Sequence, residues 1–286
     1  EATIGLALNK EAEKNNTIVT VGDGDEPVAA VELFNFAKEI SLDVIAIGKG
    51  KNNPFDVFKT PKDLEKEALK KNMNPYMLTS FVDGSKTMIE MAALANYLDF
   101  NIDTDGMHGP NSTYDELNSI FIPKSSGGIL ESTNIVDFAF GVAPGVFAIV
   151  YSDDDYVNYE MEYLKMGKGP YWTLYRPYHL TSLEIPRTIM KLMVDNETQL
   201  SAKKWNVEVV AHSKKDLKAG TNLGSIGGEN IYGKAMRVEN TKNLAPLGLA
   251  ENNTLNSDIK KGDPIEIKSI DITDNQLYKY WLSQNS

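Results

Sequence analysis

Three loops of this sequence combine glycine with charged side chains, and each could carry chemistry. In the first, residues 22–26, two glycines alternate with acids, and a proline follows. Such a loop could hold the nicotinamide end of a cofactor, a substrate hydroxyl or a divalent cation, or it could be a solvated turn whose acids cap a helix. It is not a phosphate-binding G-x-G-x-x-G motif, which occurs nowhere in the chain. The candidate cofactor residues are Gly22, Asp23, Gly24, Asp25, Glu26 and Pro27.

The second loop, residues 48–54, places Lys49 and Lys51 among glycines and asparagines. The backbone of a glycine loop can approach an anion closely, two ammonium groups would neutralise that anion, and a lysine there could also deliver a proton. A flexible basic loop is the plainer alternative. Because an acidic protein has little reason to gather lysines in a glycine turn except to meet an anion, we predict Lys49 as catalytic and Lys51 and Asn52 as substrate ligands.

The third and densest group occupies residues 165–179, where lysines, an arginine, a histidine and tyrosines lie close together in the chain. Arginine and lysine suit the capture of phosphate or carboxylate, tyrosine hydroxyls add orientation, and His179 could transfer a proton near neutral pH. The alternative is an amphipathic strand with aromatic packing. The predicted substrate ligands are Lys165, Lys168, Tyr175, Arg176 and His179.

Two further candidates are weaker when taken alone. Lys86 and Glu90 stand four residues apart on one helical face, where they form either a surface ion pair or a proton-handling pair, and Asp83 precedes that helix. His108 lies in a tight glycine-containing loop, residues 105–110, that could hold an imidazole in place. A lone histidine in a loop is nevertheless usually a surface residue without a chemical role. We predict His108 as a substrate ligand.

Several classes of site are disfavoured. With three histidines, no cysteine and no metal-binding spacing, zinc is improbable, and no G-x-S-x-G motif of a serine hydrolase occurs. Magnesium or manganese on carboxylates stays open as an alternative, but no diagnostic spacing supports it, and we predict no metal ligand. The carboxylates considered are Asp23, Asp25, Asp83 and Glu131.

Composition narrows the class of protein. The chain has 286 residues, enough for about two domains. Its net charge of -11, from 29 basic and 40 acidic residues, argues against nucleic acid or an anionic membrane as a partner. No run approaches the ~20 apolar residues of a membrane span. The absence of cysteine fits a reducing compartment, so we expect a soluble, cytoplasmic protein.

The elements that must position these loops alternate at first between helix and strand. A helix over 3–14, a strand over 17–21, a helix over 28–40 and a strand over 43–47 are typical of an α/β sheet, in which sites gather where strands end. The middle of the chain is of the α+β type, and the tail consists of short strands broken by turns. In the middle of the chain the predicted helices are 61–71, 86–98, 156–166 and 181–194, and the predicted strands are 136–142, 145–151 and 171–176, of which the first two are taken as neighbours. In the tail the predicted strands are 207–211 and 265–272.

The charge distribution changes near residue 200. Residues 202–286 hold 12 basic and 10 acidic residues, a net of +2, which leaves 17 against 30, a net of -13, for residues 1–201. A boundary there separates an acidic body from a tail long enough for a small domain. We therefore predict domains at 1–48, 49–201 and 202–286.

Six segments in order resemble the homoserine dehydrogenase-like proteins with a C-terminal SAF domain, a group that includes deoxyxylulose-phosphate reductoisomerase-like enzymes. They are residues 21–27, 48–54, 73–75, 78–87, 105–110 and 175–180. In the tail, residues 215–221 and 258–265 resemble the paired SAF signature also seen in sialic-acid synthases, altronate dehydratases and flagellar P-ring chaperones.

The resemblance implies the architecture. It makes residues 1–48 the remnant of a Rossmann-type dinucleotide domain whose glycine fingerprint precedes this chain, residues 49–201 a mixed-sheet catalytic and dimerisation domain, and residues 202–286 a SAF domain. We expect this fragment alone to be inactive and not to bind NAD or NADP tightly. We also expect a homodimer.

The resemblance also implies an activity: reduction, with or without rearrangement, of a small anionic and phosphorylated keto-sugar or hydroxy-carbonyl compound with NADP or NAD. Lys49 or Lys86 would protonate the carbonyl oxygen, and Glu90 and Asp83 would orient that lysine. Homoserine dehydrogenases carry an acid and then a lysine where this chain has Lys86 and then Glu90, which argues against homoserine itself. The alternatives are a non-catalytic sugar or sugar-acid binding protein that uses the SAF domain and, last, a flagellar-type chaperone.

Overall fold

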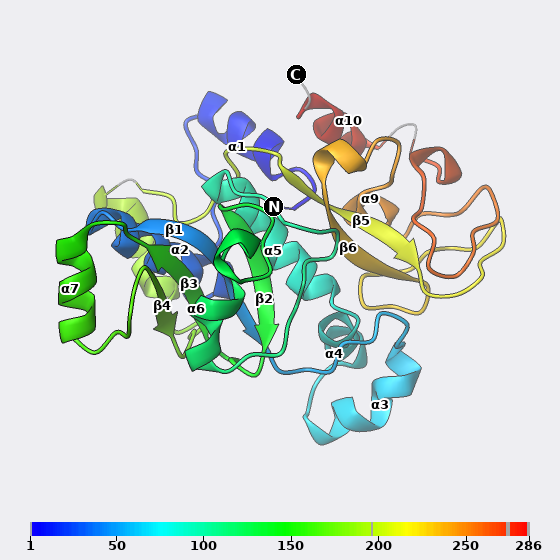
Figure 1. The fold of residues 1–286 in the computed structure, drawn as a ribbon. Helices are drawn as coiled ribbons and strands as arrows, with labels where there is room; N and C mark the ends of the chain where they lie inside the picture. The colour runs from blue at the N-terminus through cyan, green and yellow to red at the C-terminus, as the bar shows by residue number, and fades with distance from the viewer. Residues whose placement is uncertain (1, 196, 273–274, 285–286) are drawn as a thin grey trace. The chain divides into compact units, whose positions relative to one another are not determined.

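The computed structural model describes residues 2–195, 197–272 and 275–284 (Figure 1). The chain forms two compact units, and neither is continuous in sequence. The first unit comprises residues 1–17, 53–96 and 202–286, and the second comprises residues 18–52 and 97–201. The architecture is mixed α/β, as predicted. The three predicted domains, 1–48, 49–201 and 202–286, stay a prediction, and the two compact units divide the chain at other residues.

The second unit is built on a four-stranded mixed sheet with the order β2-β1-β3-β4. Its strands are β1 (Asp43–Lys51), β2 (Ile135–Phe140), β3 (Val146–Tyr151) and β4 (Tyr171–Arg176). β1 pairs parallel with β2 and antiparallel with β3, and β3 pairs antiparallel with β4. The expectation that β2 and β3 are neighbours is wrong, because β1, buried along all but its first residue, lies between them.

Register brings two predicted site residues into one row. Lys49 lies opposite Val146, and Val146 lies opposite Arg176. Because paired residues project on the same side of a sheet, Lys49 and Arg176 share a face, two strand spacings or about 10 Å apart. The helix α2 (Glu26–Glu39) packs on β1, β3 and β4, and Arg176 reaches its Glu32. The row therefore lies on the face that α2 covers.

The opposite face of the sheet carries an apolar cluster that includes Phe121, Phe147 and Ile149, with Leu117 from the short helix α6 (Leu117–Ile120). The ring of Tyr175 packs against this cluster. The core thus fixes the sheet from one side while the charged row faces α2 on the other.

Local signals explain where the helices of this unit begin. Asp25 caps α2 and Pro27 occupies its first turn. Asp154 caps α7 (Asp155–Tyr163) through the backbone N–H groups of Tyr156 and Val157. The helix predicted over 181–194 is instead α8 (Ile185–Met190) followed by a π-helical turn, Lys191–Asp195. Residues 17–21 do not form the predicted strand.

The first unit combines helices with a two-stranded antiparallel sheet. The strands are β5 (Val207–Ser213) and β6 (Ile231–Arg237); the helices are α1 (Gly5–Lys14), α3 (Pro61–Lys70), α4 (Pro75–Val82), α5 (Ser85–Leu98), α9 (Leu247–Ala250) and α10 (Gln276–Ser283). Asn96 of α5 bonds to the start of β5, since its amide nitrogen donates to the Val207 carbonyl and its oxygen accepts from two backbone N–H groups. The strand predicted over 265–272 is absent from the described residues there, where a 3₁₀ turn, Ile267–Ser269, forms instead.

Across the residues that the structure describes, no helix combines the length and the apolar character needed to cross a membrane.

Candidate functional site

The glycine-acidic loop before α2 is held by the segment around α8. Asp23 is fully buried, and its backbone N–H donates to Thr188 Oγ1 at 2.7 Å. The Thr188 hydroxyl donates to Asp23 Oδ2 at 2.7 Å, and Lys191 Nζ donates to Asp23 Oδ1 at 2.7 Å. The Asp23 carboxylate therefore holds α8 and the turn after it in place, and Lys191 balances its negative charge.

Gly24 explains why this loop needs glycine. Its φ is +88°, and a Cβ there would lie 2.8 Å from the backbone of Leu180. The space above Gly24 is thus filled by this chain rather than left open for a pyrophosphate. With the Asp23 carboxylate also engaged, the loop does not fit the phosphates of a dinucleotide, in line with its lack of a G-x-G-x-x-G motif. Its role at the nicotinamide end of the cofactor stays a prediction.

A lysine, a glutamate and a histidine meet where α2 begins. Lys49 is almost fully buried, and its Nζ donates to Glu26 Oε1 at 2.9 Å. His179 Nε2 lies 3.6 Å from the same oxygen. His179 Nδ1 lies 3.0 Å from the Gly24 carbonyl, which only accepts, so Nδ1 carries the proton. The structure thus brings together three predicted residues, Lys49, Glu26 and His179.

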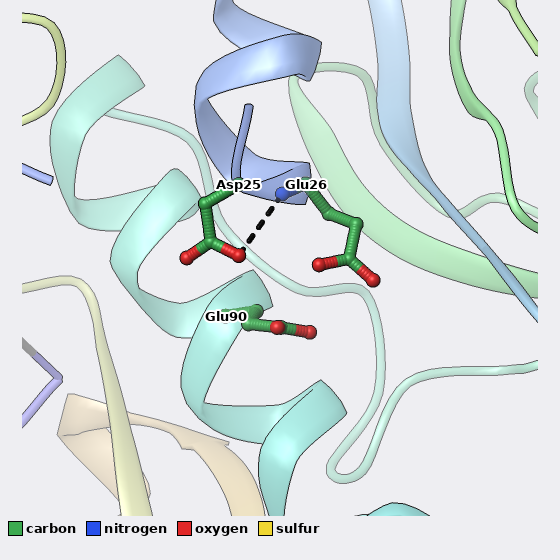
Figure 2. Close-up of side chains that lie close together, drawn as sticks. All are labelled: Asp25, Glu26 and Glu90. Carbon is green, nitrogen blue, oxygen red and sulfur yellow. Dashed lines mark hydrogen bonds between the residues drawn. The ribbon is translucent and has the colours of Figure 1, made fainter. Parts of the chain in front are cut away.

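Figure 2 shows the start of α2, where the Asp25 carboxylate accepts a hydrogen bond from the Glu26 backbone N–H at 3.2 Å. This bond satisfies one of the unpaired N–H groups of the first helical turn. Asp25 is therefore a capping residue, and it fixes the backbone from which the Glu26 side chain extends toward Lys49. Glu90, drawn in the same view, belongs to α5.

Arg176 is compensated by two carboxylates. Its guanidinium donates to Glu32 Oε2 at 2.6 Å and to Glu184 Oε1 at 2.5 Å, and it lies 4.8 Å from the centre of the Tyr178 ring. Arg187 bonds to the same two acids. An incoming anion would have to compete with both carboxylates, so the role predicted for Arg176 as a substrate ligand stays a prediction.

Glu184 is the acid at the centre of this network. Its burial alone would raise its pKa, but hydrogen bonds from Arg176, from the Leu180 N–H and from Arg187 outweigh burial and lower the pKa to about 2. Glu184 is therefore ionised at any physiological pH, and it ties the end of β4 to the start of α8.

His108 lies between two acids that sequence reasoning did not select. Its Nδ1 is 2.8 Å from Asp137 Oδ2 and its Nε2 is 3.4 Å from Asp103 Oδ2. The hydrogen bond to Asp137 raises the pKa of His108 against the opposing effect of burial. Asp137 pairs with Gly48 in β1, so by strand alternation its side chain projects to the opposite face from Lys49. His108 therefore belongs to a separate charged cluster.

The other predicted ligands of the second unit are spread over the sheet. Lys51 is buried and Asn52 is exposed at the end of β1. The Tyr175 hydroxyl donates to the Val142 carbonyl at 2.7 Å on the face away from Lys49. Lys165 and Lys168 are exposed before the first residue of β4, whereas Arg176 is its last, so the strand's length of about 17 Å separates them.

The first unit holds the remaining predicted catalytic residues. Asp83 is fully buried beside Lys214, with Nζ 2.8 Å from Oδ2, and its other oxygen accepts from the Ser85 N–H. Burial lowers the pKa of Lys214, and Asp83 opposes that effect. Lys86 pairs with Glu90 on α5. Asp83 thus serves as the partner of a buried lysine from the tail, which nothing in the local sequence signals.

The carboxylates considered for a metal all have partners within the chain. Asp23 bonds to Lys191, Asp83 pairs with Lys214, and Glu131 pairs with Lys124. Asp25 caps α2.

The second unit thus places a buried lysine near the end of a central strand, and a comparison with protein families gives the class of protein. Residues 24–185 match the family model described as the catalytic domain of the oxidoreductase DRL. The match covers more than half of the chain, so this chain belongs to that family, and it is an oxidoreductase domain. The matched span contains Glu26, Lys49 and His179. A search of the curated proteins found no match.

Proposed function

We propose that this chain is the substrate-binding and SAF portion of an oxidoreductase that reduces a carbonyl group of a small anionic compound, and that Lys49 is the proton donor. The observation that carries the proposal is the buried Lys49 Nζ, held 2.9 Å from Glu26 Oε1 at the end of a central strand of an oxidoreductase catalytic domain. Ends of strands in α/β sheets are where ligands gather. A buried ammonium there meets the developing oxyanion with little solvent to screen it.

In the proposed reaction the substrate carbonyl oxygen accepts a hydrogen bond from Lys49 Nζ. As hydride reaches the carbonyl carbon, the oxygen becomes an alkoxide and takes the proton from Nζ, which leaves a neutral amine. Glu26 orients Nζ before transfer. His179 Nε2 lies 3.6 Å from the same Glu26 oxygen and helps to position the Glu26 carboxylate.

The residues proposed for the substrate's anionic end lie on the same strand. Lys49 and Lys51 project from one face of β1, about 7 Å apart. Arg176 is bonded to Glu32 and Glu184. We propose Lys51, which is buried on the same face of β1 as Lys49, as a ligand of a carboxylate or phosphate, and a phosphorylated keto-sugar or hydroxy-carbonyl compound as the substrate class.

A reduced nicotinamide dinucleotide, NADPH or NADH, is the proposed source of hydride. Residues 22–27 are the proposed contacts of its nicotinamide end, and no step is assigned to that loop. The resemblance to homoserine dehydrogenase-like and reductoisomerase-like enzymes, the SAF character of residues 202–286 and the homodimer all belong to this proposal.

The test is NADPH oxidation by the natural full-length protein with a panel of keto-sugar phosphates and their unphosphorylated forms. Lys49→Met should lower kcat/KM about 100-fold or more, since a positioned general acid contributes about 10² to 10⁴ in rate. Lys38→Met, which changes an exposed lysine of α2 paired only loosely with Asp43 at 3.6 Å, is the matched control and should leave the rate within about twofold.

Full activity of Lys49→Met would contradict the assignment of the proton donor. Saturable binding of a sugar phosphate without NADPH consumption, lost when residues 202–286 are deleted, would favour a non-catalytic binding protein instead.

A further inference from the structure

A groove of about 460 Å³ runs between α1 and α10 within the first unit. Its volume lies in the range of small-molecule sites, roughly 300 to 1,000 Å³. Both helices fall outside the span matched by the oxidoreductase catalytic domain, residues 24–185. The groove is therefore a site that the proposed reaction does not use.

Each helix turns a polar row toward the groove. Lys10 and Lys14 of α1 lie four residues apart, and Gln276, Lys279 and Ser283 of α10 follow the i, i+3, i+7 spacing of one helical face. Faces that join two helices are usually apolar. Here the apolar sides of the two helices meet in a core cluster, in which Trp281 and Leu277 of α10 pack with Ile4 and Leu8 at the start of α1, and the polar rows line the groove.

The walls of the groove are fixed at one end. Gln284, which follows α10 and is 7% exposed, donates through Nε2 to the Thr3 carbonyl at 2.9 Å. Its Oε1 accepts from the Ala7 N–H at 3.4 Å. A ligand therefore meets two helices already held together, which lowers the ordering cost of binding.

The charge of the groove is opposite to that of the chain. Among the described residues that line the groove, three are lysines, Lys10, Lys14 and Lys279, and one is an acid, Glu11, so this lining has a net charge of +2 in a chain whose net charge is -11. Lys10 also has a partner within the chain. Glu11 lies 3.8 Å from Lys14, and both side chains are well exposed, so this ion pair contributes little interaction energy. Local excess of ammonium groups in an acidic protein favours an anion.

We propose that this groove binds the phosphate group of a small molecule. Lys10, Lys14 and Lys279 supply the charge, as compact ammonium groups do in other phosphate sites, and the Gln276 amide and the Ser283 hydroxyl bond to the remainder of the ligand. The site lies on elements outside the catalytic domain, so its occupant is a second ligand beside the substrate.

The test is a titration of the protein with inorganic pyrophosphate at constant ionic strength, followed by amide chemical shifts in NMR. Saturable shifts are expected in α1 and α10. The double variant Lys14→Gln/Lys279→Gln should weaken binding by about tenfold or more, because two of three charges are lost. Lys66→Gln changes an exposed lysine of α3 in the same unit and should bind as wild type does.

Equal affinity of the double variant and the wild type would overturn the proposal. So would shifts confined to other elements, or the lack of any saturable shift. Because all three lysines lie on the groove surface, circular dichroism of the variants is expected to match the wild type, and the catalytic assay of Lys49 is scored separately.

Discussion

Glu208 of β5 offers the sharpest stability prediction. Its side chain is completely buried, and its oxygens accept hydrogen bonds from Trp281 Nε1 at 3.0 Å, Trp205 Nε1 at 3.3 Å and the Val209 N–H at 2.8 Å. Burial raises the pKa of Glu208 to about 8, although these hydrogen bonds act in the opposite direction. The folded protein therefore holds a proton on Glu208 near neutral pH.

The sign of the effect follows from linkage. Between about pH 4.5, the ordinary value, and about pH 8, the folded state keeps a proton that the unfolded state has released. This contribution to stability is complete below the lower value and is lost as the pH rises through the upper one. A difference of 8 minus 4.5, or 3.5 in pKa, corresponds to about 5 kcal/mol at most, and we expect about 2 to 4 kcal/mol.

Glu208→Gln should remove that pH dependence. At mildly acidic pH the variant should lose about 1 to 2 kcal/mol, because the amide NH₂ cannot accept the hydrogen bond from Val209. Urea unfolding followed by tryptophan fluorescence at several pH values measures both effects. Glu239→Gln, an exposed acid next to β6, is the control. Equal pH slopes in wild type and Glu208→Gln would refute the reasoning.

Three further predictions concern the second unit. Asp23→Asn should cost about 1 to 3 kcal/mol in urea unfolding because Lys191 loses its buried carboxylate, and an unchanged midpoint would count against the anchor. The pKa of the His108 imidazole, measured by NMR, should lie above its ordinary value and fall in Asp137→Asn, so its stabilising effect is lost as pH rises through that pKa; a value unaffected by Asp137→Asn would contradict this. For the proposed homodimer, Ile189, Met190, Met193 and Val194 are exposed apolar side chains in one short segment, and Met193→Asp should shift the sedimentation profile toward monomer; an unchanged profile would exclude this surface.

Local signals in the sequence predicted much of the fold. Asp25 and Pro27 define the start of α2, and the apolar run after Asp43 predicts a buried strand. Local signals could not predict the order of the strands in the sheet. β1 lies between β2 and β3 because of contacts between residues far apart in the sequence. The two discontinuous units have the same cause, since bonds such as Asn96 to Val207 join distant segments.

The sequence predicted which residues belong to the candidate site, but not which of them contact one another. Lys49 and His179 were selected, but their meeting at Glu26 depends on α2 folding back over β1. Asp137 gave one overlooked signal, a lone carboxylate within an apolar strand, which needs hydrogen-bond partners if buried. Lys214 gave none, because its partner lies more than a hundred residues earlier in the chain.

The most direct test of the central claim, that Lys49 serves carbonyl reduction, is hydride transfer followed in single turnovers. The natural full-length protein is mixed with NADPH carrying deuterium on the transferred position and with the best substrate from the panel, and the product is analysed by mass spectrometry. We expect deuterium at the former carbonyl carbon in wild type, and a rate about 100-fold or more lower in Lys49→Met. Label transfer at the wild-type rate in Lys49→Met would contradict it.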